Sequence, residues 1–121
     1  MARRIVLSID QGTDTQVSVS VRDSTGQTVD MASARMQLRP TIESEIISDE
    51  LTTENGRITI EAGSLALVFP NAVTTAMNAG TYAYDLEIVS SLGMVTRVME
   101  GTVTIRPEVT RNDSEESDAS E

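Results

Sequence analysis

Apolar and polar residues alternate with a period of two along most of the sequence, which is the pattern of half-buried β-strands. Ile5, Leu7 and Ile9 form the first apolar series, and residues 17–21 repeat it with three valines. Further runs occupy residues 34–38, 57–60, 65–69, 82–88 and about 94–105, with Asn55-Gly56 as the strongest short hairpin signal between them. Seven or more short strands at this spacing predict a β-sandwich.

Two stretches interrupt the alternation. Residues 41–50 place Ile42, Ile46 and Ile47 at helical spacing, although an irregular crossover between two sheets fits them equally. Residues 71–77 follow Pro70 and precede Gly80. They predict one short helical turn between the fifth and sixth strands, with Gly80 ending it.

Tyr82 makes the prediction of the fold more specific. Immunoglobulin-type sandwiches carry a tyrosine near the start of their sixth strand, and its hydroxyl bonds to backbone upstream. Tyr82 follows Gly80-Thr81 and fits that position, whereas Tyr84 stands where antibody domains have their second cysteine. We therefore predict an all-β, immunoglobulin-like antiparallel β-sandwich held together by packing alone. The residues expected in its core are Val17, Val19, Val21, Met36, Leu67, Tyr82, Leu86 and Val98.

Composition narrows the chemistry that such a domain could perform. Aromatic residues make up 2% of the chain, so the core must be aliphatic, with the six methionines as adaptable filling. Cys and His are absent, which removes disulfides, the usual zinc ligands and every nucleophile that depends on Cys or His. The sequence thus predicts a protein that is not an enzyme and takes neither a cofactor nor a small-molecule substrate.

Charge separates a domain from a tail. The chain has 19 acidic residues against nine arginines, a net charge of −10 that argues against binding nucleic acid or an anionic membrane. Residues 1–111 form the predicted sandwich domain, where 14 acids against nine arginines leave −5. Residues 112–121 hold the other five acids and no cation, so we expect a flexible acidic tail.

The remaining acidic residues have plain structural interpretations. Asp10 and Asp14 flank Gly12 but lack the further acids of a calcium loop, so we interpret them as turn residues. Arginines scattered along the strands are expected in cross-strand ion pairs, such as Arg97 with Glu100. A second group of carboxylates is interpreted as a solvated face rather than an acid–base pair; its members are Glu43, Glu45, Asp49, Glu50 and Glu54.

We find no targeting signal in the first residues of the sequence. Its short apolar stretch is interrupted by Ser8 and Asp10, which is too brief for a signal peptide or a spanning helix. We expect synthesis in the cytoplasm and no membrane insertion.

Four stretches, read in order, resemble a known family: residues 9–30, 34–40, 51–69 and 79–111. The last runs through Tyr84-Asp85-Leu86-Glu87, then Gly93-x-Val95-Thr96-Arg97, Glu100-Gly101-Thr102-Val103 and Pro107-Glu108-Val109-Thr110-Arg111. Together they resemble the small immunoglobulin-like structural proteins of tailed bacteriophages. The similarity extends from about Ile5 to Arg111 and excludes the acidic tail.

This resemblance implies a non-enzymatic virion protein, made in the host cytoplasm, that docks to other virion proteins at the tail, baseplate or fibres. It implies several copies per particle and no catalytic residues. Two alternatives stay open: a decoration protein of the capsid head, and an adhesin-like binding module. A small phage-encoded enzyme or inhibitor is a further class, and an enzyme of this composition would have to rely on carboxylates.

Candidate assembly contacts lie at the two ends of the chain. Residues 2–6 form an expected N-terminal arm that carries Arg3 and Arg4 and could add to a neighbour's sheet edge. At the other end, the acidic tail could bind a basic groove of a neighbour. Its candidate contact residues are Asp113, Glu115, Glu116 and Asp118.

Overall fold

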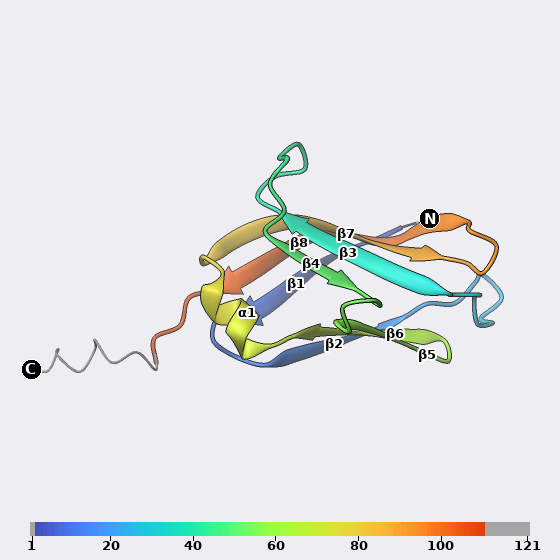
Figure 1. The fold of residues 1–121 in the computed structure, drawn as a ribbon, viewed down its shortest axis with the longest axis horizontal. Helices are drawn as coiled ribbons and strands as arrows, with labels where there is room; N and C mark the ends of the chain where they lie inside the picture. Colours follow the sequence, from blue (N-terminus) through green and yellow to red (C-terminus); the bar gives the residue numbers. More distant parts are fainter. Residues whose placement is uncertain (1, 111–121) are drawn as a thin grey trace, which may run out of the picture.

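The structure is a computed structural model that describes residues 2–110, and it is a sandwich of two β-sheets (Figure 1). Five strands in the order β1-β8-β7-β3-β4 form one sheet, and β2-β6-β5 form the other. The strands are β1 (Arg3–Asp10), β2 (Thr15–Ser20), β3 (Ser33–Arg39), β4 (Asp49–Thr52), β5 (Ile58–Glu61), β6 (Ser64–Phe69), β7 (Gly80–Val89) and β8 (Val95–Arg106). The helix α1 (Asn71–Ala76) is a short turn of six residues.

The division of strands between the sheets is that of an immunoglobulin-like domain. β2, β5 and β6 take the places of strands B, D and E, while β3, β7 and β8 take those of C, F and G. This confirms the predicted fold class. β1 joins β8 in a parallel pair, with Arg3 opposite Met99 and Asp10 opposite Arg106, so the sandwich is antiparallel everywhere except at this edge.

The structure has one strand, β4, that the sequence did not predict, and it comes before the helix in the chain. Residues 41–50 contain no helix; they form a loop that ends where Asp49 starts β4, which pairs with β3. α1 therefore lies between the sixth and seventh strands. It ends at Ala76, and Gly80 instead begins β7 with a φ of 144°. The sequence left a helix and an irregular crossover between two sheets equally open for residues 41–50, and the structure has neither, because β3 and β4 pair within the same sheet.

The core lies between the two sheets and is almost wholly aliphatic. Of the eight residues predicted for it, Val19, Val21, Met36, Leu67 and Leu86 are buried. Val17, Tyr82 and Val98 are only partly buried, and they pack against its margin. The largest side chains with essentially no exposure are Phe69, Ile9, Met36, Leu38, Leu51, Leu65, Leu67, Leu86, Met99, Ile105 and Val103.

Tyr82 makes the hydrogen bond to upstream backbone that the sequence predicts, an arrangement known as a tyrosine corner. Its hydroxyl donates a hydrogen bond of 2.6 Å to the carbonyl of Asn78, four residues upstream. The bond fixes the chain where it leaves α1 and enters β7. None of the helical structure within residues 2–110 has the length and apolar character needed to span a bilayer.

Candidate docking surfaces

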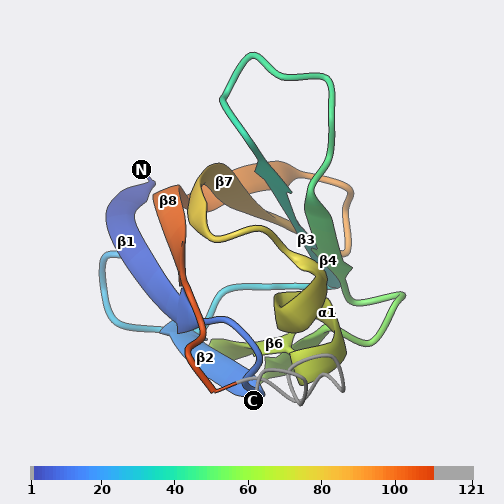
Figure 2. The same cartoon turned by 90° about the vertical axis from the view of Figure 1, so that its left-hand side faces the viewer.

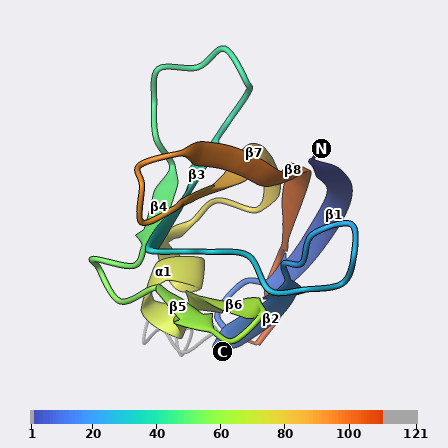
Figure 3. The same ribbon diagram turned by 90° about the vertical axis from the view of Figure 1, so that its right-hand side faces the viewer.

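The segment that joins β3 to β4, residues 40–48, projects away from the sandwich, and we call it the crossover loop (Figures 2 and 3). Its three isoleucines are the apolar side chains that it offers to solvent: Ile42 is 79% exposed, Ile46 67% and Ile47 44%. Singly exposed apolar residues are common on protein surfaces, whereas three on one projecting segment make that segment a candidate contact site.

Hydrogen bonds to its own residues and to β3 hold the crossover loop in shape. The Arg39 guanidinium donates to the Ser44 carbonyl at 2.8 Å, and the Ser48 N–H donates to the Leu38 carbonyl at 2.7 Å. The Ile46 N–H donates to the Ser44 hydroxyl at 3.0 Å. A loop ordered in this way loses less conformational entropy when a partner covers it.

A second apolar patch lies at the turn between β7 and β8, residues 90–94. Leu92 is 91% exposed and Met94 is 69% exposed. Asp30 secures this turn, because its carboxylate accepts hydrogen bonds from the Ser91 hydroxyl at 2.6 Å and the Ser91 N–H at 3.1 Å. The same bonds, that of the hydroxyl above all, lower the pKa of Asp30.

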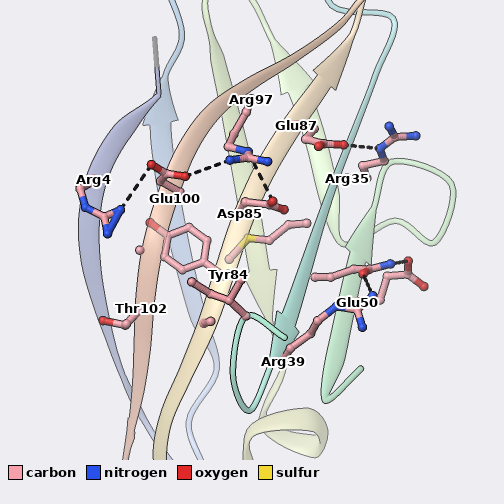
Figure 4. Close-up of a pocket in the computed structure, with 15 residues that line it drawn as sticks. Arg4, Arg35, Arg39, Glu50, Tyr84, Asp85, Glu87, Arg97, Glu100 and Thr102 are labelled. Atoms are coloured by element: carbon pink, nitrogen blue, oxygen red, sulfur yellow. Dashed lines mark hydrogen bonds and ion pairs between the residues drawn. The ribbon is translucent and has the colours of Figure 1, made fainter. Parts of the chain in front are cut away.

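The outer face of the five-stranded sheet is a shallow depression of about 670 Å³ lined by paired charges (Figure 4). Four arginines and four carboxylates line it: Arg4, Arg35, Arg39, Arg97, Glu50, Asp85, Glu87 and Glu100. One chain of ion pairs crosses three strands, from Arg4 to Glu100 at 3.3 Å, Glu100 to Arg97 at 3.1 Å, and Arg97 to Asp85 at 3.4 Å.

This face has the chemistry of a pre-ordered polar surface. The Arg97–Glu100 pair expected from the sequence is present, and Arg35 bonds Glu87 at 2.8 Å. Burial raises the pKa of Asp85, and the adjacent Glu87 carboxylate raises it further. Lining charges of both signs in equal number leave this face without an excess of positive charge.

Tyr84 connects three strands beneath that face. It lies opposite Gly101 in the β7–β8 pair, and its hydroxyl reaches past β8 to donate to the Ile5 carbonyl of β1 at 2.8 Å. Burial raises the pKa of Tyr84 to about 12. The tyrosine at the position of the missing cysteine thus ties the edge strand β1 to its own sheet and makes no link between the two sheets.

Two of the predicted assembly contacts lie in β1 rather than on a free arm. The strand begins at Arg3, whose guanidinium donates to the Ser20 carbonyl at 2.6 Å, while Arg4 pairs with Glu100. The predicted arm of residues 2–6 is therefore mostly strand, because β8 extends far enough to pair with it. The candidate contacts Asp113, Glu115, Glu116 and Asp118 lie outside the described residues.

The loop between β1 and β2 holds α1. Asp14 lies in this loop, as its interpretation as a turn residue predicts, while Asp10 is the last residue of β1 and its carbonyl accepts the Thr13 N–H that begins the turn. Asp14 accepts the Asn71 N–H at 2.7 Å, which lowers the pKa of Asp14. The buried Thr74 hydroxyl accepts the Gly12 N–H at 3.0 Å and donates to the Thr13 carbonyl at 2.9 Å. Within residues 2–110, no group of three or more His, Cys, Asp or Glu side chains is placed to hold a metal ion.

Asp49 corrects the interpretation of the acidic crossover as a solvated face. Its side chain is 9% exposed and makes a two-pronged pair with Arg57, at 2.7 and 3.1 Å. Arg57 also donates to the Val68 carbonyl at 2.9 Å and lies over the Phe69 ring, 5.9 Å from its centre. Asp49 starts β4 of one sheet, and Arg57 lies eight residues further on, directly before β5 of the other sheet. The local sequence pattern therefore gave no sign of the pair.

The three isoleucines of the crossover loop are candidate contact residues that the sequence did not single out. Their signal was present: three large apolar residues in an acidic segment that does not alternate. Only their exposure, which depends on where the loop leaves the sandwich, separates a contact site from an ordinary core segment.

Comparison with known proteins supports the fold and goes no further. No protein-family model and no curated protein sequence matches the chain. Among solved structures, CopC from Methylosinus trichosporium OB3b has a similar fold, with a TM-score of 0.50 and 13% sequence identity. The similarity covers 92% of this chain and 89% of that chain. At this identity the likeness concerns the sandwich fold alone.

Proposed function

We propose that the protein is a non-enzymatic structural component of a tailed bacteriophage virion, which docks to other virion proteins at the tail, baseplate or fibres. The crossover loop is the observation that supports docking. It presents Ile42, Ile46 and Ile47 to solvent on a projecting segment held by its own hydrogen bonds. The assignment to a virion rests on the sequence resemblance described above.

Docking through such a loop follows ordinary interface physics. Burying one large apolar side chain in a partner's pocket contributes roughly 1.5–3 kcal/mol, so two or three isoleucines supply a useful share of an interface. The charged outer face, which Ile42 borders, offers ion pairs and hydrogen bonds that orient the partner.

Particle incorporation tests this proposal. Wild-type protein should co-purify with virions, and immunogold labelling should place it on the tail, baseplate or fibres. Ile46→Asp should lower its copy number at least tenfold, whereas Val109→Asp, a matched change at a residue that is 89% exposed, should not.

The possible outcomes test separately the virion role, the location in the particle and the crossover loop as the contact. Protein that stays in the lysate contradicts a virion role, and label on the capsid head favours the decoration alternative. Normal incorporation of Ile46→Asp leaves the virion assignment intact and removes the crossover loop as its contact.

The acidic tail has its own test. Deleting residues 112–121 removes five carboxylates. If the tail binds an arginine-rich neighbour, incorporation should fall on deletion, and the full-length protein should dissociate from particles more readily as salt rises, because exposed pairs are screened. Unchanged incorporation and salt tolerance would make the tail a solvating terminus.

A further inference from the structure

Within residues 2–110, no strand pairs with the outer edge of β1. β1 is the terminal strand of the five-stranded sheet, and its eight residues pair with β8 on one side only. At its middle, Val6 is 70% exposed. An open strand with β-branched residues is a template for a further strand.

The backbone groups that face this open edge can be assigned. Ile5 directs its carbonyl toward β8 and Tyr84, and the Gln11 N–H donates to the Arg106 carbonyl of β8 at 2.9 Å. Because backbone groups of successive strand residues point alternately to the two sides, those of the even-numbered residues face outward. Within residues 2–110, the outward groups of Val6 and Ser8 have no hydrogen-bond partner.

Charge makes the same edge self-complementary. The outer-face side chains of β1 are, in order, Arg4, Val6, Ser8 and Asp10. Arg4 and Asp10 stand near opposite ends of the strand, with side chains 75% and 63% exposed. Each is already paired within its own molecule, Arg4 with Glu100 and Asp10 with Arg106 at 3.6 Å.

We propose that the partner at this edge is a second copy of the chain, whose β1 pairs antiparallel about a two-fold axis at Leu7. In this register Arg4 lies opposite the partner's Asp10, and Val6 lies opposite the partner's Ser8. The two five-stranded sheets then become one continuous sheet. Such an interface is isologous, with each contact made twice.

This register is the one that satisfies both backbone and charge. Val6 and the partner's Ser8 become a hydrogen-bonded pair that exchanges two N–H···O bonds, and the two-fold axis repeats it. The ion pairs extend into an alternating row: Glu100, Arg4, the partner's Asp10 and the partner's Arg106. Centring the pairing on Val6 also satisfies the backbone, but it sets Arg4 opposite the uncharged Ser8.

A single introduced cysteine reports the register, since the natural chain has none. At the axis, Leu7 and the partner's Leu7 form a non-hydrogen-bonded pair with Cα atoms about 4.5 Å apart, within the range that a disulfide bridges. Leu7→Cys should therefore form a covalent dimer on mild oxidation. Ile5→Cys, on the same strand and face, should not, because its two copies would lie roughly 13 Å apart.

Solution mass tests the charge pairing. Sedimentation of the full chain should show a species of twice the 13.0 kDa chain mass. Arg4→Glu should weaken the dimer about tenfold, and Asp10→Arg likewise, while the double variant should recover most of the affinity. Arg35→Glu, which reverses an exposed arginine on β3, three strands inward from β1, is the matched control and should leave the affinity unchanged.

Each contrary result overturns the proposal. A wild-type chain that stays monomeric at about 1 mM contradicts any such dimer. Equal cross-linking of Leu7→Cys and Ile5→Cys, or no recovery in the charge-exchanged double variant, contradicts the register. Melting curves confirm that each variant is folded. Because these measurements need no other virion protein, they succeed or fail independently of the proposed docking function.

Discussion

Arg57 and Asp49 hold the two sheets together by a contact that almost excludes water, with side chains 15% and 9% exposed. A carboxylate left without its arginine in such a place costs far more free energy than an exposed pair contributes. Arg57 also covers the Phe69 ring, so its loss removes packing as well as charge.

We predict that Arg57→Ala lowers the free energy of unfolding by about 3–5 kcal/mol, because it leaves Asp49 buried and unpaired. The double variant Arg57→Met with Asp49→Leu should cost less, since it leaves no charge behind. Urea denaturation measures both. Arg35→Ala, at a half-exposed pair, should cost about 0–1 kcal/mol, and an equal cost for Arg57→Ala would contradict this account.

Tyr82→Phe removes only the hydroxyl that donates to the Asn78 carbonyl. We predict a loss of about 0.5–1.5 kcal/mol in the free energy of unfolding, the net value of one hydrogen bond. Thermal and urea unfolding measure it. An unchanged melting curve would mean that this corner adds nothing to stability.

Tyr84 predicts an alkaline limit to stability. Its pKa is raised to about 12 by burial, above the ordinary value of 10.0, so folding favours the neutral hydroxyl. The resulting stabilisation is complete below pH 10 and is lost as the pH rises through about 12. Unfolding measured from pH 9 to 12 should show this loss, and Tyr84→Phe should reduce the slope. A slope unchanged in Tyr84→Phe would assign the alkaline limit to other groups.

At the scale of elements, the pairing of β1 with β8 depends on a glycine. Gly101 has a φ of 146°, and a Cβ placed there would collide with the Ile5 carbonyl. A side chain at this position would push the two strands apart at the point where Tyr84 also reaches β1.

A second glycine, with a similar φ but open space around it, allows the cost of backbone strain to be measured apart from the cost of a steric collision. Gly80 has a φ of 144°, and a Cβ there would meet no atom within 4 Å. We predict that Gly80→Ala costs about 1–3 kcal/mol of stability through backbone strain, and that Gly101→Ala costs measurably more. Urea unfolding compares them. Equal costs would show that β8 moves aside freely at Ile5.

At the scale of the whole molecule, three exposed aspartates in turns and loops make the fold sensitive to acid. Hydrogen bonds lower the pKa of each below its ordinary value of 3.8: chiefly from the Asn71 N–H for Asp14, from the Thr25 hydroxyl for Asp23, and from the Ser91 hydroxyl for Asp30. Their contribution is therefore present above pH 3.8 and is lost as the pH falls through their lower folded values.

We predict that stability falls as the pH drops below about 4, and that changing all three aspartates to asparagine flattens this fall. Urea midpoints measured from pH 2 to 7 test it. Asp85, whose pKa is raised by burial, acts with the opposite sign and should be left unchanged in the variant. An acid slope identical in both proteins would place the sensitivity elsewhere.

The strands, the corner at Tyr82 and the turns around them could be predicted because each depends on neighbours in the chain. Alternation of side chains marks a strand without reference to its partner, and Tyr82 bonds only four residues upstream. Turn chemistry is equally local: Asp23 closes its turn on Thr25 and Gln27. These features made the sandwich recognisable from the sequence.

The partners of those strands were decided only by the tertiary structure. Nothing local shows that β1 lies parallel to β8, nearly a hundred residues away, or that Asp49 meets Arg57 across the sheets. Asn55-Gly56, which favours a hairpin, instead turns the chain from one sheet to the other. The candidate docking surfaces depend on such choices, because the exposure of the crossover isoleucines and the open edge of β1 follow from where each element stops being covered by others.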